Sequence, residues 1–250
     1  MEPHEYQTFY EFEDHYWWFR GLRKMIIQSL DALALPPKSR VLDVGCGTGG
    51  TLAALIPKFQ IQGFAFDISE HAMPFLKKRH LNHVGVGSVN AIPCKSEIFE
   101  AVLCIDVFES KSVEVETALL ELNRVLKKSG ILLMIVPAYE WLKSSEHHAA
   151  VHASRRYNRR QVKFLLQNAG FKVKRTTYCF ALIFPLIAIY RFMLKLKPKP
   201  DHKTAPRSEL KHLPEVIQSI LTGIVLIENW LLRYINFGWG SSILAIAEKP

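Results

Sequence analysis

A carboxylate and a row of glycines stand together near the start of the regular part of the chain. Residues 41–50 read VLDVGCGTGG, so a short apolar run that carries Asp43 passes into a turn with Gly45, Gly47 and Gly49. Glycine lets the backbone bend sharply and approach a ligand without a Cβ in the way, and the helix that follows begins with free amide donors. Because α/β sheets bind ligands at such turns, the segment predicts a cofactor site.

The glycines alone do not identify that cofactor. Gly45, Gly47 and Gly50 also match the fingerprint of the dinucleotide-binding folds. Asp67 follows Gly45 by 22 residues, a position from which a carboxylate hydrogen-bonds the ribose in either cofactor class. These residues predict a bound nucleoside and leave its class open.

The elements that must position these residues alternate along the chain. From residue 40 onward, short apolar runs are separated by segments of helical period, which is typical of crossover units in a parallel sheet. We expect strands at 41–44, 61–66, 83–86, 101–105, 131–136, 171–178 and 241–247. We expect helices at 51–59, 70–80, 113–128, 159–169 and 215–235, with Gly130 at the C-cap of helix 113–128.

Two apolar segments interrupt this order before the last strand. The run 179–190, which contains Pro185, is shorter than the about 20 residues that cross a bilayer. Helix 215–235 places apolar residues near one face, which favours packing against the core over lying on a membrane. The residues of that face are Ile217, Ile220, Leu221, Ile224, Leu231 and Ile235.

Composition limits the class of protein. The 250 residues are 49% hydrophobic and 22% charged, which predicts a folded domain and neither a disordered chain nor a multi-span membrane protein. The four cysteines lie far apart, so they offer neither a disulfide framework nor a zinc site. The acidic, aromatic N-terminus does not resemble a secretory signal, and we expect a cytoplasmic protein.

Positive charge is concentrated in one region. The net charge is +9, and residues 155–211 hold 15 Lys or Arg against two acidic residues. This segment predicts either a solvated basic face or a peripheral contact with the inner face of an anionic membrane. No RNA-binding module or groove-reading motif accompanies the charge, so nucleic acid is not expected as a partner.

The pattern D-x-G-x-G-x-G from Asp43 to Gly49 resembles motif I of the class I S-adenosylmethionine-dependent methyltransferases. Further segments are similar to the family's later motifs, in the same order: 87–93 (GSVNAIP), 99–102 (FEAV), 106–109 (DVFE) and 121–127 (ELNRVLK). The resemblance covers about residues 38–178. It implies S-adenosylmethionine as cofactor and an α/β, Rossmann-like, doubly wound sheet of seven mostly parallel strands, with an N-terminal helical cap and a helical insertion before the last strand.

The ends of the chain are similar to a narrower set of bacterial methyltransferases often associated with surface-glycan or lipid pathways. The similar segments are 16–20 (YWWFR), 136–142 (VPAYEWL), 155–157 (RRY) and 242–250. We therefore expect four parts. They are a helical cap at 1–37, the cofactor-binding core at 38–178, a basic and apolar helical insertion at 179–240, and the final strand at 241–250.

The resemblance also implies which residues contact the cofactor. Asp43 would orient the loop and the methionine end, Asp67 would hold the ribose, and residues 88–90 would flank the adenine. The full set is Asp43, Gly45, Cys46, Gly47, Gly49, Asp67, Ile68, Ser88, Val89, Asn90, Ile105 and Asp106. The family usually has Asp where Ser88 stands, so Asn90 is a candidate to replace that carboxylate.

The family's usual histidine after the fourth strand is replaced here by Ser110, so a general base must come from elsewhere if the acceptor needs one. His147 is the first candidate and His152 the second, because a histidine accepts a proton readily near neutral pH. Glu109 is the third. The alternatives for the histidine loop are a solvated loop and a metal site, but no Cys or helical H-E-x-x-H pattern supports a metal and none is expected.

Acceptor contacts are expected from aromatic and arginine side chains. They are Trp17, Trp18, Arg20, Tyr139, Arg155, Arg156 and Tyr157. Guanidinium groups suit carboxylates and phosphates, so the two neighbouring arginines could clamp an acidic group. The alternatives are a basic helix start for the arginines and a packed N-terminal helix for the tryptophans.

Together these features predict an enzyme that methylates a hydroxyl or carboxylate of a small-molecule, glycan or lipid-linked acceptor. Two alternatives stay open. One is a non-catalytic regulatory or scaffold protein that binds S-adenosylmethionine, suggested by Ser88 and Ser110. The other is a nicotinamide oxidoreductase, suggested by the glycine spacing.

Overall fold

A seven-stranded sheet forms the centre of the protein. The computed structural model describes residues 1–143, 150, 152–196, 208, 210 and 212–250. The strands are β1 (Arg40–Val44), β2 (Gln62–Asp67), β3 (His83–Val86), β4 (Phe99–Ile105), β5 (Leu126–Pro137), β6 (Lys172–Cys179) and β7 (Ser242–Glu248). Their order is β3-β2-β1-β4-β5-β7-β6, in which β7 pairs antiparallel with β5 and β6. The sheet confirms the expected fold class.

The order of the strands creates a place for a ligand. From β1 the chain passes outward to β2 and β3 and then returns to β4 on the other side of β1. Such a reversal leaves a crevice at the carboxyl ends of the two central strands, because their following loops turn away from each other. Residues on β1 and β4 such as Val41, Val44 and Leu103 are almost fully buried, so the strands hold these loops rigidly.

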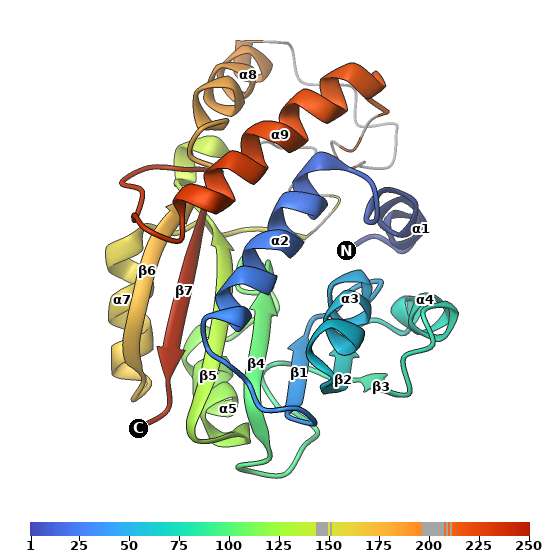
Figure 1. The fold of residues 1–250 in the computed structure, drawn as a ribbon, viewed down its shortest axis with the longest axis vertical. Coiled ribbons are helices and arrows are strands. Elements are labelled where there is room, and N and C mark those ends of the chain that lie inside the picture. Colours follow the sequence, from blue (N-terminus) through green and yellow to red (C-terminus); the bar gives the residue numbers. More distant parts are fainter. Residues whose placement is uncertain (144–149, 151, 197–207, 209, 211) are drawn as a thin grey trace.

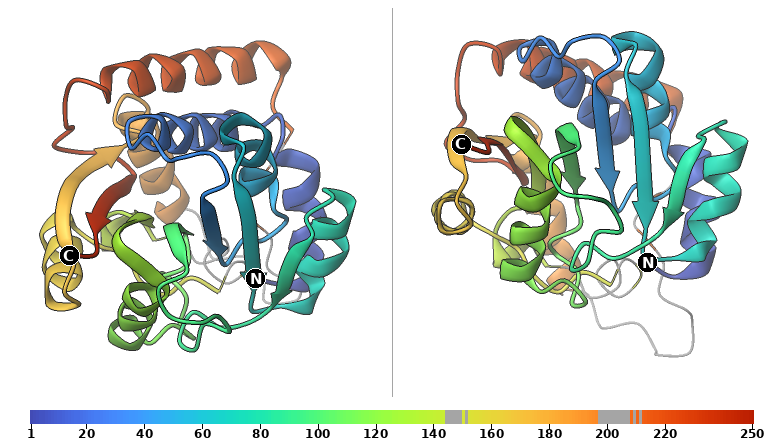
Figure 2. Two further views of the ribbon diagram at one scale, coloured as in Figure 1. Left: turned by 60° about the horizontal axis from the view of Figure 1, so that its bottom comes forward. Right: turned by 90° about the horizontal axis from the view of Figure 1, so that it is seen from below.

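Helices cover both faces of the sheet (Figures 1 and 2). One face carries α2 (Trp17–Asp31) and α3 (Gly50–Phe59), and the other carries α5 (Val115–Val125) and α7 (Arg159–Asn168). The remaining α-helices are α1 (Pro3–Phe12), α4 (Met73–Lys78), α8 (Phe184–Leu196) and α9 (Glu215–Leu231). α9 packs outside α2. Gly21 permits this close approach, since a Cβ there would lie 2.1 Å from Val225 Cγ1.

Two predicted helices have different bounds in the structure. The helix expected at 113–128 ends at Val125, because Leu126 already pairs with Phe99 as the first residue of β5. The prediction of Gly130 as its C-cap was therefore wrong. The helix expected at 70–80 is divided into a 3₁₀ turn (Glu70–Ala72) and α4, which begins at Met73 with a proline in its first turn.

The predicted packing face of the last helix was correct for Leu221 and Leu231, which pack against the core, and wrong for three other residues. Ile217, Ile220 and Ile235 are exposed, whereas α9 buries Thr222, Val225, Glu228 and Asn229 against the protein. The physical reason is that buried backbone groups on neighbouring segments need hydrogen-bond partners, which the polar side chains of α9 supply. Among the described residues, no helix combines the length and the apolar character that crossing a membrane requires.

Candidate functional site

The glycine-rich turn after β1 has a backbone that glycine favours. Gly45, Gly47 and Gly49 have φ angles of +68°, +55° and +81°. These values lie in the left-handed region, where a Cβ is strained. A Cβ on Gly45 would lie 2.6 Å from Val107 Cγ2, but a Cβ on Gly47 would meet no atom within 4 Å. Gly47 therefore borders open space at the carboxyl end of the sheet.

Asp43 is a buried carboxylate in β1 that accepts no hydrogen bond from the described part of the chain. Only 3% of the residue is exposed, and no described residue donates a hydrogen bond to it. Burial raises the pKa of Asp43 to about 8, and the nearby carboxylates of Glu13 and Asp67 add to the shift. A buried charge without a partner is costly, so the site favours either protonation of Asp43 or a cation beside it.

Asp67, at the end of β2, is held by three donors. Tyr6 Oη donates to Asp67 Oδ1 at 2.8 Å, and the backbone N–H of Ser69 donates to the same oxygen at 3.0 Å. The N–H of Gly47 donates to Oδ2 at 3.0 Å. The carboxylate thus links α1 to the glycine turn, and one acceptor direction on Oδ2 remains for a further donor.

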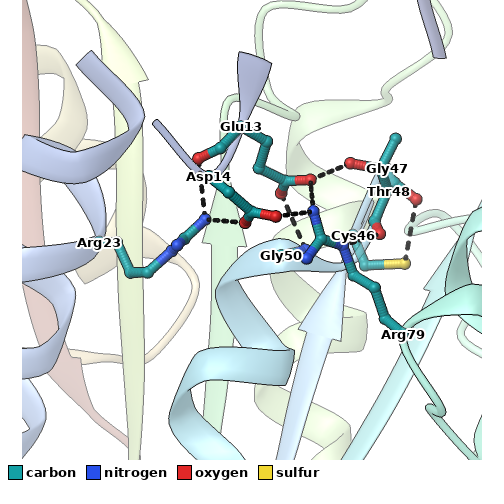
Figure 3. Close-up of polar contacts among 8 residues, drawn as sticks. All are labelled: Glu13, Asp14, Arg23, Cys46, Gly47, Thr48, Gly50 and Arg79. Atoms are coloured by element: carbon teal, nitrogen blue, oxygen red, sulfur yellow. Dashed lines mark hydrogen bonds and ion pairs between the residues drawn. The ribbon is translucent and has the colours of Figure 1, made fainter. Parts of the chain in front are cut away.

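Glu13 caps the helix that follows the glycine turn (Figure 3). Its carboxylate accepts hydrogen bonds from Thr48 Oγ1 and from the N–H of Gly50 at 2.8 Å, at the first residue of α3. The N-cap residue Gly49 has no side chain to do this, so Glu13 supplies the acceptor that the helix start lacks. Burial nevertheless raises the pKa of Glu13, against the lowering effect of its hydrogen bonds.

Two arginines complete this contact between the N-terminal segment and the core (Figure 3). Arg79 donates to Glu13 Oε2 at 3.0 Å, to Asp14 Oδ2 at 3.2 Å and to the carbonyl of Thr48 at 3.0 Å. Arg23 donates to the carbonyl of Glu13 at 3.0 Å. Sequence reasoning missed Glu13 and Arg79 as site residues, and it considered Tyr6 only as part of an aromatic lid over cofactor and acceptor. No local motif marks them, because each acts on a partner at least 31 residues away.

The segment expected near the adenine is held by its own side chains. Val89 is buried, and Ser88 forms an isolated bridge with Ala91. The carboxamide of Asn90 donates to the carbonyl of Ser112 at 2.8 Å and accepts from the N–H of Glu114 at 3.0 Å. Asn90 therefore ties this segment to the loop after β4. Ile68 stands exposed directly after Asp67.

A second group of charged residues lies where β4 ends. Asp106 has a φ of +49° and follows Ile105, and Glu109 is buried with its Oε2 atom unpartnered among the described residues. Burial raises the pKa of Asp106 to about 7 and also raises that of Glu109, which Asp106 repels further. Arg156 opposes both shifts, and its own pKa falls to about 10 because it is buried and lies near Arg191. The cluster contains two carboxylates that share one nearby guanidinium group.

Arg155 and Tyr157 bind the backbone that carries Glu109. Tyr157 Oη donates to the carbonyl of Phe108 at 2.8 Å, and Arg155 donates to the carbonyls of Phe108 and Lys111, both at 3.4 Å. The N–H groups of Ser154 and Arg155 donate to the carbonyl of Glu109. These contacts fix the loop after β4, so the two side chains position the charged cluster.

The aromatic candidates fall in two places. Trp18 stacks on Phe180 at 5.8 Å and Trp17 meets the same ring edge-on, so both pack against the core. Arg20 is exposed on α2. Tyr139, with a φ of +56°, stacks on Tyr178 at 5.3 Å. Tyr139 lies directly after β5, on the same sheet edge as Asp106.

The histidine candidates are only partly placed. His147 lies outside the described residues. His152 is exposed, with its Nε2 atom 2.9 Å from Glu2 Oε1 and its Nδ1 atom 3.4 Å from the N-terminal amine. In the described part of the chain, no group of three metal-ligating side chains comes together.

Comparisons of sequence agree with this geometry. The family model for a methyltransferase domain, Methyltransf_23, matches residues 18–176, which include both strands of the crevice and the glycine turn. No curated protein matches the chain in sequence.

Solved structures share the fold at low sequence identity. A chain from the complex of the Haloferax volcanii Trm112 methyltransferase activator with a methyltransferase aligns with a TM-score of 0.62 at 17% identity, covering 98% of both chains. A SAM-dependent methyltransferase of Thermotoga maritima gives 0.59 at 20%, covering 99% of this chain and 96% of the other. Geranyl diphosphate C-methyltransferase of Streptomyces coelicolor, in complex with S-adenosylhomocysteine, gives 0.55 at 14%, covering 88% and 76%. The family match extends over more than half of the chain, so the protein belongs to the methyltransferase-domain family and is a methyltransferase.

Proposed function

We propose that the protein transfers the methyl group of S-adenosylmethionine to a hydroxyl or carboxylate of a small-molecule, glycan or lipid-linked acceptor. The cofactor is S-adenosylmethionine, as the family match indicates. The observation that carries the proposed site is Asp43, a carboxylate with 3% exposure and no hydrogen bond from any described residue, beside a glycine turn that borders open space. A ligand with a positively charged methionine end would compensate this carboxylate.

The other residues of the turn fit the remaining parts of the cofactor. Asp67 Oδ2 retains an acceptor direction for a ribose hydroxyl, and the absence of a side chain at Gly47 leaves room along the backbone. The exposed side chain of Ile68 offers an apolar surface for the adenine, next to Ser88 and Val89. We therefore assign the cofactor to the crevice between β1 and β4.

The protein's part in the reaction is mainly to hold the reactants in line and to exclude water. When bound, S-adenosylmethionine supplies an activated methyl group on a positively charged sulfur. The residues at the end of β4 would receive the acceptor, because Ile105 and Asp106 lie at the same crevice as the glycine turn. The side chain of Arg156 would attract an acceptor with an acidic group.

Glu109 is the residue we propose as proton acceptor for a hydroxyl substrate. Its buried Oε2 atom is free of partners in the described structure, and burial, together with repulsion from Asp106, raises its pKa well above the ordinary value, so the ionised carboxylate would take up a proton readily. A carboxylate acceptor would need no base. His147 and His152 stay as the alternative bases for the hydroxyl reaction.

The surroundings of α8 support a lipid-linked acceptor. Its Arg191 lies near enough to Arg156 to lower the pKa of that residue, so α8 reaches the charged cluster. The same helix exposes Leu186, Ile189, Phe192 and Met193. A chain that carries a charged head and an apolar tail would find both kinds of contact along this helix.

Calorimetric titration with S-adenosylmethionine and S-adenosylhomocysteine tests the cofactor site. We expect binding by the unchanged protein and at least a tenfold loss of affinity for S-adenosylmethionine in Asp43→Asn, which removes about 1.4 kcal/mol or more of charge interaction. Glu116→Gln, at an exposed carboxylate on α5, is the matched control and should bind normally. Equal affinity in Asp43→Asn and the control would contradict the assignment of Asp43.

A further inference from the structure

α9 turns three of its polar side chains, Thr222, Glu228 and Asn229, toward the protein. Its buried side chains are Thr222, Val225, Glu228 and Asn229. Glu228 Oε2 accepts a hydrogen bond from the N–H of Leu182 at 2.9 Å, and Asn229 Nδ2 donates to the carbonyl of Gly21 at 2.9 Å. These bonds fix α9 on α2 and on the turn before α8. The polar face of the helix is thus used inside the fold.

The outward face of α9 is apolar. Five large residues, four on α9 and Tyr234 in the turn just after it, recur at intervals of three, four or seven positions and are more than half exposed: Val216 71%, Ile220 57%, Ile227 57%, Trp230 55% and Tyr234 71%. We call these five residues the α9 stripe. The sequence from 216 to 227 contains no charged residue at all. A helix face in water normally carries charges, and a contiguous exposed apolar surface marks an interaction site.

The stripe lies on the outside of the molecule. Figures 1 and 2 show α9 as the outermost layer on its side of the sheet, with α2 beneath it. Within the described ranges, the five side chains remain exposed after all packing of the chain on itself. The fold therefore leaves this surface to a partner.

The charges around the stripe indicate what that partner is. Arg20 and Lys24 are exposed on α2, which lies alongside, and Arg233 is exposed just after Trp230. Two acidic residues, Glu215 and Asp31, are exposed at the ends of the two helices. The surroundings are therefore net basic, complementary to anionic headgroups.

The residue types within the stripe favour a lipid surface. Isoleucine and valine occupy its first part, and Trp230 and Tyr234 its second. Tryptophan and tyrosine prefer the boundary between headgroups and acyl chains. An apolar helix face bordered by basic residues combines insertion with attraction to anionic lipid, the two contributions that hold a peripheral protein.

We propose that the α9 stripe docks on an anionic lipid bilayer, with α9 lying flat in the headgroup boundary. At 17 residues, the helix would extend about 25 Å along the surface. This docking does not depend on methyl transfer, so it can fail while the proposed reaction stands. It would place the enzyme where a lipid-linked acceptor is found.

Co-flotation of the full chain with vesicles tests the docking. The vesicles would contain phosphatidylcholine alone or with 30% phosphatidylglycerol, at low salt and at 0.5 M NaCl. The test variant is Ile220→Gln/Ile227→Gln/Trp230→Gln, which changes only exposed side chains. The matched control is Leu120→Gln/Phe164→Gln, at residues of α5 and α7 with 60% and 62% exposure on the other face of the sheet. Thermal melts verify that both variants fold.

We expect flotation with the anionic vesicles, weakened by salt, and a fall of about tenfold or more in the bound fraction for the test variant but not for the control. Quenching of tryptophan fluorescence by brominated lipid should fall in Trp230→Phe. Sedimentation without lipid tests whether a second copy of this chain covers the α9 stripe instead. Absence of flotation, equal flotation of the test variant, or a dimer that the test variant abolishes in place of lipid binding would each overturn the proposal.

Discussion

At the scale of single residues, the site is defined by carboxylates that the fold buries. Asp43, Asp106 and Glu109 all have raised pKa values, and burial is the first cause in each case. The raised pKa values indicate different roles because the charged groups near each carboxylate differ. Asp43 stands beside other carboxylates, so it favours a cationic ligand, whereas Asp106 and Glu109 share Arg156 and are suited to exchange a proton.

The proton-accepting role of Glu109 predicts a pH dependence. A base must be deprotonated, and burial followed by repulsion from Asp106 raises the pKa of Glu109 well above its ordinary value, so methyl transfer to a hydroxyl should increase as the pH rises. Glu109→Gln should lower kcat roughly 10²-fold or more and flatten this profile, while the affinity for S-adenosylmethionine stays unchanged. The rate and its pH profile are measured as transfer of labelled methyl groups into an extract of cells that lack the gene. If Glu109→Gln keeps the pH profile of the unchanged protein, His147 or His152 would be the candidate general base instead.

Replacing glycine by alanine should have different effects at two positions of the glycine turn. Gly47→Ala should cost about 1 kcal/mol of stability through its positive φ, yet its Cβ would enter the open space and weaken cofactor binding. Gly49→Ala should cost roughly 2–4 kcal/mol, since its Cβ would lie 2.6 Å from the buried side chain of Leu76 and 2.7 Å from that of Leu81. Urea unfolding and calorimetry separate the two. The same loss of stability in both variants would show that the space beside Gly47 is not open.

At the scale of elements, the first turn of α3 is capped by Glu13, a residue that is distant in sequence and follows α1. Glu13 follows α1 directly and reaches the first residue of α3, and Tyr6 of α1 binds Asp67 at the end of β2. The N-terminal helix is therefore tied to both sides of the glycine turn. We expect this attachment to shape the proposed cofactor site.

Removing the Glu13 carboxylate should loosen this attachment. Glu13→Ala leaves the N–H of Gly50 and the hydroxyl of Thr48 without their acceptor and removes one of the three acceptors of Arg79, and we expect a loss of roughly 3 kcal/mol in the free energy of unfolding. Asp14→Ala is the control, because that carboxylate also pairs with Arg79 but is 57% exposed, and it should cost less than about 1 kcal/mol. Equal losses measured by urea unfolding would contradict the capping role of Glu13.

At the scale of the whole molecule, the buried carboxylates make folding depend on pH. The folded-state pKa of Asp43 is about 8 and that of Asp106 about 7, both above the ordinary value of 3.8. Between the ordinary pKa and the folded-state pKa of each group, the folded protein binds more protons than the unfolded one. The free energy of unfolding therefore falls as the pH rises through this window. Each such group contributes a slope of about 1.4 kcal/mol per pH unit inside its window.

We therefore expect the free energy of unfolding, without cofactor, to decrease between about pH 4 and pH 8. Asp43→Asn should reduce the slope by the amount due to one proton, and Glu116→Gln should leave it unchanged. Urea unfolding at pH 5, 6, 7 and 8 gives the comparison. If the slope is the same in Asp43→Asn, the raised pKa of Asp43 is wrong.

The sequence by itself determined the features that depend on neighbouring residues. The glycine turn, its preceding Asp43 and the alternation of strands and helices are local patterns, so the class of fold was predictable, and the proposed cofactor site rests on the same residues. The end of helix 113–128 was not, because pairing of Leu126 with Phe99 outweighs the helical preference of its own segment.

Only the tertiary structure decided which distant residues complete the site. Tyr6, Glu13 and Arg79 meet partners 31 to 66 residues away, and no local pattern encodes such contacts. The orientation of α9 was decided in the same way. Its periodicity shows two faces, but the hydrogen bonds of Glu228 and Asn229 with backbone groups draw these polar residues inward and leave Ile217 and Ile220 exposed.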